Sequence, residues 1–355
     1  MAEKVLMKGN EAIAEAAVIA GCRHYFGYPI TPQTEITEYM ARRMPKVNGV
    51  FVQSESEVAA INMVYGAAGA GARVMTSSSS PGISLKQEGI SYIAAAQLPA
   101  VIVNIMRGGP GLGTIQASQA DYFQATKGGG HGDYRLLVLA PNSVQEMIDL
   151  TIEAFDLADK YRTPIMILGD GAIGQMMEPA VLPEPVERNV DKSKWATTTR
   201  AKRTSGGPNV INSLFLQAED LEKYNVVLQE KFATIANNEV RFDSYLTDDA
   251  DIVVVGYGIM SRIAHGAIDK LRAKGLRVGL LRPITLWPFP YMAIQNLIPT
   301  AKKFLVAEMS AGQMIEDVML AVVNRRPVYL CGKMGGVIPT VDQMIKEIIR
   351  VSEAV

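Results

Sequence analysis

The chain has 355 residues, with 35 basic and 36 acidic side chains and a formal net charge of −1 at pH 7. This balance argues against nucleic acid as a partner, because phosphate binding needs a basic excess on one face. Two cysteines are too few for a disulfide framework or a four-cysteine iron–sulfur cluster, and no two of the three histidines stand at zinc-ligand spacing. The sequence has neither a secretory signal nor an apolar run of the roughly 20 residues that a membrane span needs, so we expect a cytoplasmic globular protein with no metal site of its own.

Short apolar runs alternate with helical stretches as far as about residue 185. Runs such as AVIVNIM are apolar without alternation, which is typical of strands buried on both faces of a parallel sheet. This order predicts an α/β domain with helices on both sides of the sheet. We expect strands near 24–28, 49–53, 73–77, 100–106, 135–140 and 164–168, and helices over 11–20 (capped by Asn10), from 32, from 56, over 85–96 and over 144–161.

The amino-acid composition changes after the first predicted α/β domain. Residues 178–205 are first proline-rich, then basic, then small and polar, which is typical of a surface excursion or linker. A helical pattern over 212–237 precedes a second α/β unit, with strands expected at 251–255, 277–281, 303–307 and 327–330. The sequence therefore predicts two open parallel-sheet domains, over 1–185 and 246–355, joined by a linker with a helix over 186–245.

The segment GYPITP, residues 27–32, follows the first predicted strand. Pro32 would stand at the first position of a helix, which makes Thr31 the predicted N-cap residue. A capping hydroxyl accepts a hydrogen bond and keeps its own proton for a ligand, and ligands bind at the carboxyl ends of strands in open α/β sheets. The alternative is that Thr31 only caps the helix.

Two carboxylates, Glu55 and Glu57, stand at the entrance to a helix rich in small residues. Residues two apart lie on different helix faces, so at most one of them reaches the crevice of the sheet. We expect this to be Glu57, which apolar residues follow. The alternative is that both acids only complement the helix dipole.

Arg107 follows the strand at 100–106 and opens the glycine-rich loop RGGPGLG. An arginine at the carboxyl end of a strand is suited to bind a carboxylate or phosphate through two hydrogen bonds. The alternative is a surface arginine on a mobile loop. The segment SSSSPGIS, residues 77–84, is another turn from strand to helix whose free amide groups can hold a polar ligand.

Two further segments resemble cofactor motifs only in part. GDG at 169–171 lacks the paired asparagines that follow some 25 residues later in thiamine enzymes, so we interpret it as the end of a strand. VVVGYGIMS has Ser261 in place of the third glycine of a dinucleotide site, which disfavours a nicotinamide-dependent oxidoreductase.

Several motifs in order resemble the α subunit of 2-oxoacid:ferredoxin oxidoreductases over about residues 5–180. They are GYPITP, SESEVAAINMVYGAA, SSPGISLKQEGISY, RGGPGLG, GGGHGDYR and APNSVQE. RPITLWPFP and VAEMSAGQM resemble the transketolase C-terminal-like domain of the same subunit. The segment GPGLGTIQASQADYF is most similar to the branched-chain (2-ketoisovalerate) type, and the 2-oxoglutarate type is the alternative.

The resemblance implies that the first domain has the fold that binds the pyrimidine ring of thiamine diphosphate. It also implies that the chain is active only together with partner subunits. It implies that Glu57 contacts the pyrimidine ring nitrogen, and that Thr31 and Arg107 hold the keto and carboxylate groups of the oxoacid. It implies that a β subunit supplies the diphosphate site, Mg²⁺ and a [4Fe-4S] cluster, and that γ and δ subunits, coenzyme A and ferredoxin take part. A non-catalytic scaffold is the other alternative, but it would need none of these three side chains. The expected cofactor-binding residues are Tyr28, Pro29, Ile30, Thr31, Glu57 and Ser80.

Overall fold

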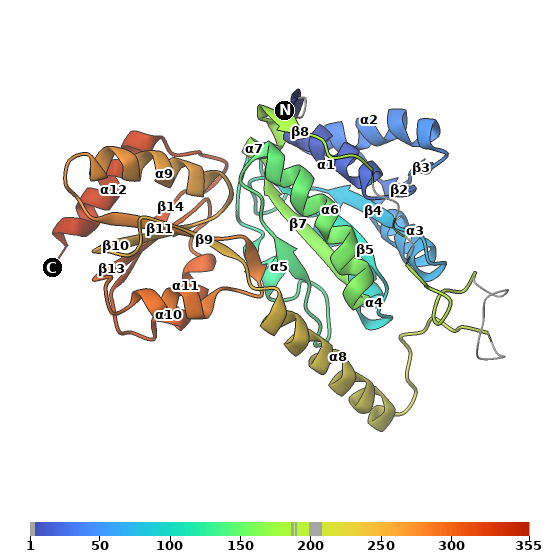
Figure 1. Ribbon diagram of the computed structural model, residues 1–355. Coiled ribbons are helices and arrows are strands. Elements are labelled where there is room, and N and C mark those ends of the chain that lie inside the picture. Colours follow the sequence, from blue (N-terminus) through green and yellow to red (C-terminus); the bar gives the residue numbers. More distant parts are fainter. Residues whose placement is uncertain (1–3, 186–187, 189, 199–207, 355) are drawn as a thin grey trace.

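The computed structural model describes residues 4–185, 188, 190–198 and 208–354, which form two α/β units (Figure 1). A seven-stranded sheet is the centre of the first unit, and a five-stranded sheet is the centre of the second. The predicted class, two open and mainly parallel α/β sheets, is confirmed. The parts of the predicted linker at 186–187, 189 and 199–207 lie outside the described residues.

The first sheet has the strand order β12-β6-β7-β5-β4-β2-β3, and its neighbours pair in parallel except for the antiparallel edge strand β12. Its strands are β2 (His24–Gly27), β3 (Val50–Gln53), β4 (Val74–Ser78), β5 (Ala100–Met106), β6 (Leu137–Leu139), β7 (Pro164–Asp170) and β12 (Thr285–Trp287). Its helices are α1 (Gly9–Ile19), α2 (Thr34–Arg43), α3 (Glu57–Gly69), α4 (Ser80–Ala95), α5 (Tyr122–Thr126), α6 (Val144–Tyr161) and α7 (Gly171–Gln175), with a 3₁₀ turn at Met44–Val47. An antiparallel pair, β1 (Lys4–Lys8) and β8 (Met177–Val181), lies beside this sheet.

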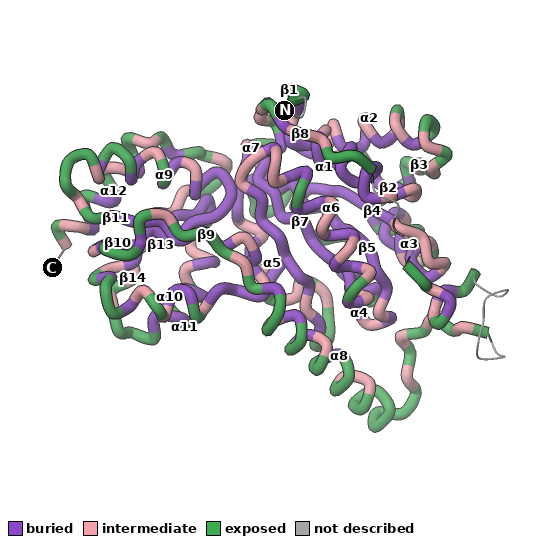
Figure 2. Tube along the Cα trace, viewed as in Figure 1, coloured by how far each residue is buried: buried purple, intermediate pink, exposed green. Residues whose placement is uncertain are grey.

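The second sheet has the order β14-β13-β10-β11-β9, with β9 as its antiparallel edge. Its strands are β9 (Phe242–Tyr245), β10 (Ile252–Gly256), β11 (Val278–Pro283), β13 (Lys303–Glu308) and β14 (Val328–Gly332). The helices of this half are α8 (Ala218–Asn238), α9 (Gly258–Arg272), α10 (Tyr291–Leu297), α11 (Met314–Val322) and α12 (Val341–Glu353). Figure 2 shows that the central strands are buried, whereas α8 is exposed along most of its length.

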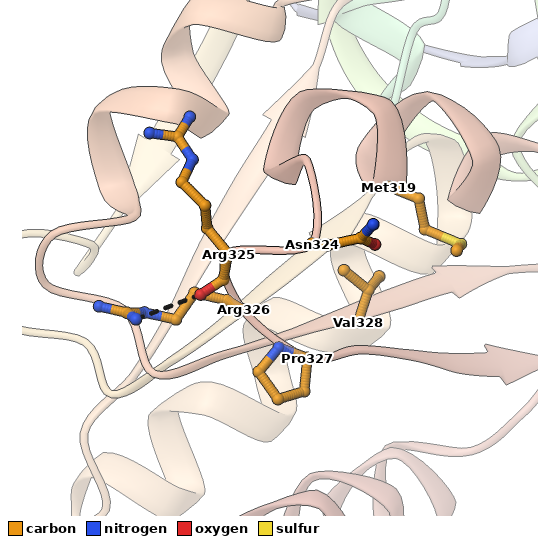
Figure 3. A pocket seen from close by; sticks show the side chains of 6 residues that line it. All are labelled: Met319, Asn324, Arg325, Arg326, Pro327 and Val328. Atoms are coloured by element: carbon orange, nitrogen blue, oxygen red, sulfur yellow. Dashed lines mark hydrogen bonds between the residues drawn. The ribbon is translucent and has the colours of Figure 1, made fainter.

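The second unit also has a cavity of about 360 Å³ between the end of α11 and the start of β14 (Figure 3). Arg326 donates a hydrogen bond to the backbone carbonyl of Arg325 within it, at 3.2 Å. None of the residues predicted to form the active site lines this cavity. Its six lining residues are Met319, Asn324, Arg325, Arg326, Pro327 and Val328.

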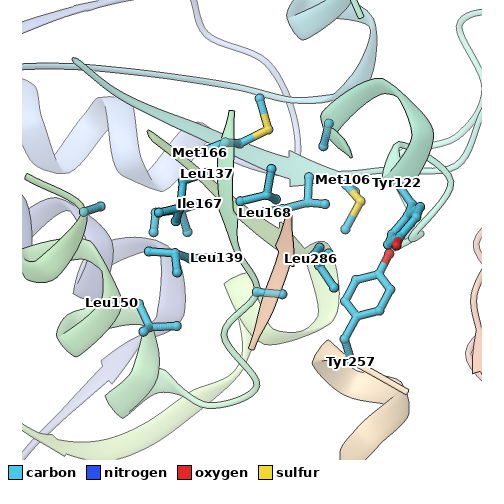
Figure 4. Close-up of a cluster of buried hydrophobic side chains, with 14 of the residues drawn as sticks. Met106, Tyr122, Leu137, Leu139, Leu150, Met166, Ile167, Leu168, Tyr257 and Leu286 are labelled. Carbon is cyan, nitrogen blue, oxygen red and sulfur yellow. The ribbon is translucent and has the colours of Figure 1, made fainter. Parts of the chain in front are cut away.

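The two units share a continuous hydrophobic core. Leu286 of β12 and Tyr257, which precedes α9, are almost fully buried and pack with Tyr122 and the side chains of β6 and β7 (Figure 4). The Tyr257 hydroxyl donates to the carbonyl of Gln119 at 3.2 Å. A strand from the second half thus completes the first sheet, and the division into 1–185, 186–245 and 246–355 stays a prediction.

Four predicted helix starts are wrong, and one of them is that of α2, which begins at Thr34 rather than at 32. Helix α1 begins at Gly9 rather than after Asn10, and the Asn10 side chain donates instead to the Pro32 carbonyl at 2.7 Å. Helix α4 begins at Ser80 rather than at 85, because Pro81 fits the first turn of a helix. Helix α8 begins at Ala218 rather than at 212.

None of the helices in the described part of the chain combines the length and the apolar character that a membrane-spanning helix requires.

Candidate active site

Glu57 is the first residue of α3 and is 7% exposed. Ser56 caps the helix, since its hydroxyl accepts a hydrogen bond from the Ala59 amide at 3.2 Å. Glu55 is exposed and precedes the cap, so it does not lie on another face of the helix as the sequence spacing predicted. Glu57 is therefore the carboxylate that turns into the molecule, at the carboxyl end of the sheet.

Two glycines bring α4 close to this carboxylate. A Cβ at Gly82 would lie 2.1 Å from the Ser78 hydroxyl and 2.7 Å from Glu57 Oε1, and a Cβ at Gly89 would lie 2.5 Å from Ile61. Residues seven apart share one face of a helix, so α4 approaches α3 closely at two positions that carry no side chain. This pair was not predicted, because Gly82 precedes the helix expected over 85–96, although the seven-residue spacing of the two glycines is visible in the sequence.

Four consecutive serines, residues 77–80, end β4 and begin α4. The Ser78 and Ser79 hydroxyls are buried and make no hydrogen bond. Ser80 is also buried, but its hydroxyl contacts Asp121 Oδ2 at 2.6 Å and accepts from the Arg107 amide at 3.0 Å. The chain itself thus engages Ser80, whereas Ser78 and Ser79 keep their hydrogen-bonding capacity for a ligand.

The loop at 27–32 is anchored at its base and open at its tip. Gln33 is fully buried, donates to the Tyr28 carbonyl at 3.3 Å and accepts from the Ser77 hydroxyl at 2.6 Å. The Pro32 carbonyl accepts from Asn10 and, at 3.0 Å, from Gln175. The tip residues Tyr28, Pro29 and Thr31 are exposed and Ile30 is half-buried.

Thr31 is not the N-cap residue, contrary to the sequence prediction. The Gln33 amide donates to the Ile30 carbonyl at 3.1 Å, which closes a turn around Thr31 and Pro32. Helix α2 therefore begins only at Thr34, with Gln33 at its N-cap position. Thr31 lies in the turn and is available for contacts outside the chain.

Arg107 is buried, which excludes the interpretation as a surface arginine. It is 7% exposed, and its guanidinium group donates to the carbonyls of Thr31 and Leu112, each at 3.0 Å. Its Nε is buried without a hydrogen-bond partner. The structure thus brings Arg107 beside Thr31 at the edge where β2 and β5 end. The Ser80 hydroxyl connects the Arg107 backbone to the start of α4, and α4 in turn packs against Glu57 at Gly82.

Asp170 of the GDG segment stands at the end of β7, as predicted. It accepts from the Ile173 amide at 3.1 Å and from the Ile259 amide at 2.8 Å, and so caps both α7 and α9. Burial raises the pKa of Asp170 above its usual range. Its carboxylate is thus committed to joining the two units. Among the described residues, no group of three or more His, Cys, Asp or Glu side chains could hold a metal ion.

The sequence model of the family "Pyruvate flavodoxin/ferredoxin oxidoreductase, thiamine diP-bdg" matches residues 15–245, and that of "Pyruvate:ferredoxin oxidoreductase core domain II" matches residues 250–344. The chain belongs to the family that these two models describe. The family is that of the thiamine diphosphate-dependent 2-oxoacid:ferredoxin oxidoreductases, so the family identified from the sequence motifs is confirmed.

Relatives and a solved structure agree with this assignment. The chain is 53% identical to the ketoisovalerate oxidoreductase subunit VorB of Methanothermobacter thermautotrophicus over 98% of this chain and 97% of that protein. It is 37% identical to the 2-oxoglutarate synthase subunit KorA of Methanothermobacter marburgensis over 98% and 99%, respectively. A 2-oxoglutarate:ferredoxin oxidoreductase from Magnetococcus marinus, solved with 2-oxoglutarate, coenzyme A and succinyl-CoA bound, superposes with a TM-score of 0.89 at 26% identity. The superposition covers 98% of this chain and 65% of the length of that one.

The residues present fit the pyrimidine half of a thiamine diphosphate site. The Glu57 carboxylate is nine-tenths buried, and the unpartnered hydroxyls of Ser78 and Ser79 lie at the adjoining strand end. A flat ring with several nitrogen atoms can use such a set of acceptors and donors. The carboxylate of the GDG segment, Asp170, caps two helices and is therefore not free to bind Mg²⁺.

Proposed function

We propose that this chain is the catalytic α subunit of a ferredoxin oxidoreductase specific for branched-chain 2-oxoacids such as 2-ketoisovalerate. The observation that carries the proposal is the buried Glu57 carboxylate beside two unpartnered hydroxyls, with Arg107 and Thr31 paired at the same edge of the sheet. Identity of 53% to a ketoisovalerate oxidoreductase subunit, against 37% to a 2-oxoglutarate synthase subunit, supports the branched-chain substrate.

Within this proposal, each residue has one task. Glu57 binds the pyrimidine ring nitrogen and exchanges a proton with it. Arg107 binds the substrate carboxylate by exchanging its present backbone partners for carboxylate oxygens, and its free Nε adds a further donor. Thr31 donates its hydroxyl proton to the keto oxygen. The loop residues Tyr28, Pro29 and Ile30, together with Ser80, line the cofactor.

Bound thiamine diphosphate would supply the carbon nucleophile and store the electrons released from the substrate. In the overall reaction, the bond between the keto carbon and the carboxylate breaks and CO₂ leaves. A bond forms between the keto carbon and the sulfur of coenzyme A, whose thiol proton is released. Two electrons pass to two oxidised ferredoxin centres.

Partner subunits complete the site in this proposal. A β subunit holds the diphosphate, Mg²⁺ and a [4Fe-4S] cluster, and γ and δ subunits extend the electron path to ferredoxin. We place the complex in the cytoplasm, where Cys22 and Cys331 would stay free thiols, as they are in the structure.

The test is the activity of the purified complex with coenzyme A, thiamine diphosphate, Mg²⁺ and ferredoxin. We expect kcat/KM for 2-ketoisovalerate to exceed that for 2-oxoglutarate and pyruvate. Higher kcat/KM for 2-oxoglutarate would favour the alternative substrate class. A complex that contains this chain and turns over no 2-oxoacid would favour the scaffold alternative.

A further inference from the structure

Lys86 is a fully buried lysine in the middle of α4. Its ammonium group donates to the Thr76 hydroxyl at 2.6 Å and to the Ser77 carbonyl at 3.1 Å, near the end of β4. Both partners are uncharged, so no carboxylate binds this cation directly. Burying an ammonium group in this way is costly, and an apolar side chain of similar length would avoid the cost.

The position of Lys86 relates it to Glu57. Lys86 follows Gly82 by four residues, so both lie on one face of α4, and long helical side chains extend toward the N-terminus. Gly82 is the residue against which the Glu57 carboxylate packs. The two partners of Lys86 directly precede Ser78, whose hydroxyl is the other neighbour of Gly82. The lysine and the glutamate thus approach the same end of β4 from different helices.

Electrostatics couples the two groups. Burial lowers the pKa of Lys86 to about 7, and the negative charge of Glu57 on α3 acts in the opposite direction. On β4, the side facing Lys86 presents the Thr76 hydroxyl and the Ser77 carbonyl, which are neutral. Glu57 is therefore the charged group through which Lys86 can act.

We propose that Lys86 is a positioning residue for catalysis, whose buried ammonium group supplies the positive charge that faces the Glu57 carboxylate. A neighbouring cation stabilises the charged form of a buried carboxylate. The charged form of Glu57 is the one that stabilises a protonated ring nitrogen. This inference rests on the proposed function, since it assigns Glu57 to that ring nitrogen.

The test compares K86M with the matched variant K231M in the assembled complex. Methionine keeps the length of the side chain and removes the charge. Lys231 of α8 is likewise a desolvated lysine, with a pKa lowered to about 7, and it donates to Gln97 and to the Arg162 carbonyl, away from Glu57. We expect K86M to lower kcat by about tenfold, the effect of one pK unit of lost interaction, with little change in KM for the oxoacid. K231M should leave kcat unchanged.

The pH profile separates this role from simple packing. In the wild-type complex, kcat should fall on the alkaline side as Lys86 loses its proton, and this limb should be absent in K86M.

Thermal unfolding of the full chain gives a second readout. As the pH rises from 6 to 9, the melting temperature of K86M should decrease relative to that of the wild-type protein. The sign follows because the unfolded state binds more protons at Lys86 over this range, which stabilises the wild-type protein as the pH rises. K231M should show the same unfolding trend without the change in kcat.

Two results would overturn the proposal: an unchanged kcat in K86M, or a lowered kcat that keeps the wild-type alkaline limb. The E57Q complex distinguishes failure of this inference from failure of the proposed function. If E57Q is inactive while K86M behaves as wild type, only the role of Lys86 is wrong. If E57Q keeps full activity, the assignment of Glu57 itself is wrong.

Discussion

Arg107 donates a hydrogen bond from Nη1 to the carbonyl oxygen of Thr31, at 3.0 Å, across 76 residues of sequence. The contact joins the loop after β2 to the loop after β5, two strands that are separated by β4 in the sheet. Arg107 also donates to the Leu112 carbonyl. One buried guanidinium therefore fixes the backbone of both loops that are proposed to hold the substrate.

Substituting Arg107 with lysine should impair substrate use far more than cofactor binding. Lysine keeps the charge but loses the planar fork that binds two acceptors in parallel. We expect a loss of roughly 2–4 kcal/mol in kcat/KM, as for a partly desolvated ionic hydrogen bond. Steady-state kinetics with 2-ketoisovalerate and 2-oxoglutarate measure the loss, and titration with thiamine diphosphate supplies the control. Normal kinetics with impaired cofactor binding would make Arg107 a cofactor residue.

Substituting Glu57 with glutamine should lower turnover by about 10²-fold or more, the contribution expected of a group that exchanges a proton in catalysis. The substitution keeps the shape of the side chain in its position against Gly82. Glu55→Gln is the matched control, because Glu55 is exposed and lies outside α3. Turnover numbers of the two assembled variants decide the matter. Equal losses would show that the active carboxylate has been misassigned.

The sequence predicts best the features that depend on neighbouring residues. The predicted strand at 100–106 and helix at 144–161 coincide with β5 and α6. The start of α6 can be recognised in the sequence because Ser143 caps the helix. Its hydroxyl accepts a hydrogen bond from the Glu146 amide at 3.1 Å. A continuous apolar run and a local cap are both properties of short segments.

Features that depend on distant contacts could not be predicted in this way. Strand β12 joins a sheet whose other strands precede it by more than a hundred residues. The turn at Thr31 excludes the predicted cap because Asn10 and Gln175, from other elements, bind the Pro32 carbonyl. The close approach of Glu57 to Gly82 requires the crossing of α3 and α4, which only the folded chain defines.

The isolated chain should bind thiamine diphosphate weakly. Its described residues offer an environment for the pyrimidine ring, but the carboxylate of the GDG segment is engaged at two helix starts. Most of the binding energy of the cofactor would then come from the diphosphate and Mg²⁺ on another subunit. Calorimetry on this chain alone measures the affinity. Binding at micromolar concentration or tighter, without a partner, would contradict a site shared between two subunits.

Substituting Gly82 with alanine should displace Glu57 and destabilise the protein. The added Cβ would lie 2.1 Å from the Ser78 hydroxyl and 2.7 Å from Glu57 Oε1, so both side chains would have to shift. Overpacking of a buried contact costs about 1–3 kcal/mol of unfolding free energy.

Gly66→Ala is the matched control, since Gly66 lies in α3 with no atom within 4 Å of its added Cβ. That control should gain about 0.5–1 kcal/mol, because alanine favours a helix interior over glycine. Chemical denaturation of both full-length variants measures the two effects. Turnover of the assembled complexes should fall only for Gly82→Ala, and equal stability of the two variants would show that the α3–α4 contact tolerates a side chain at this point.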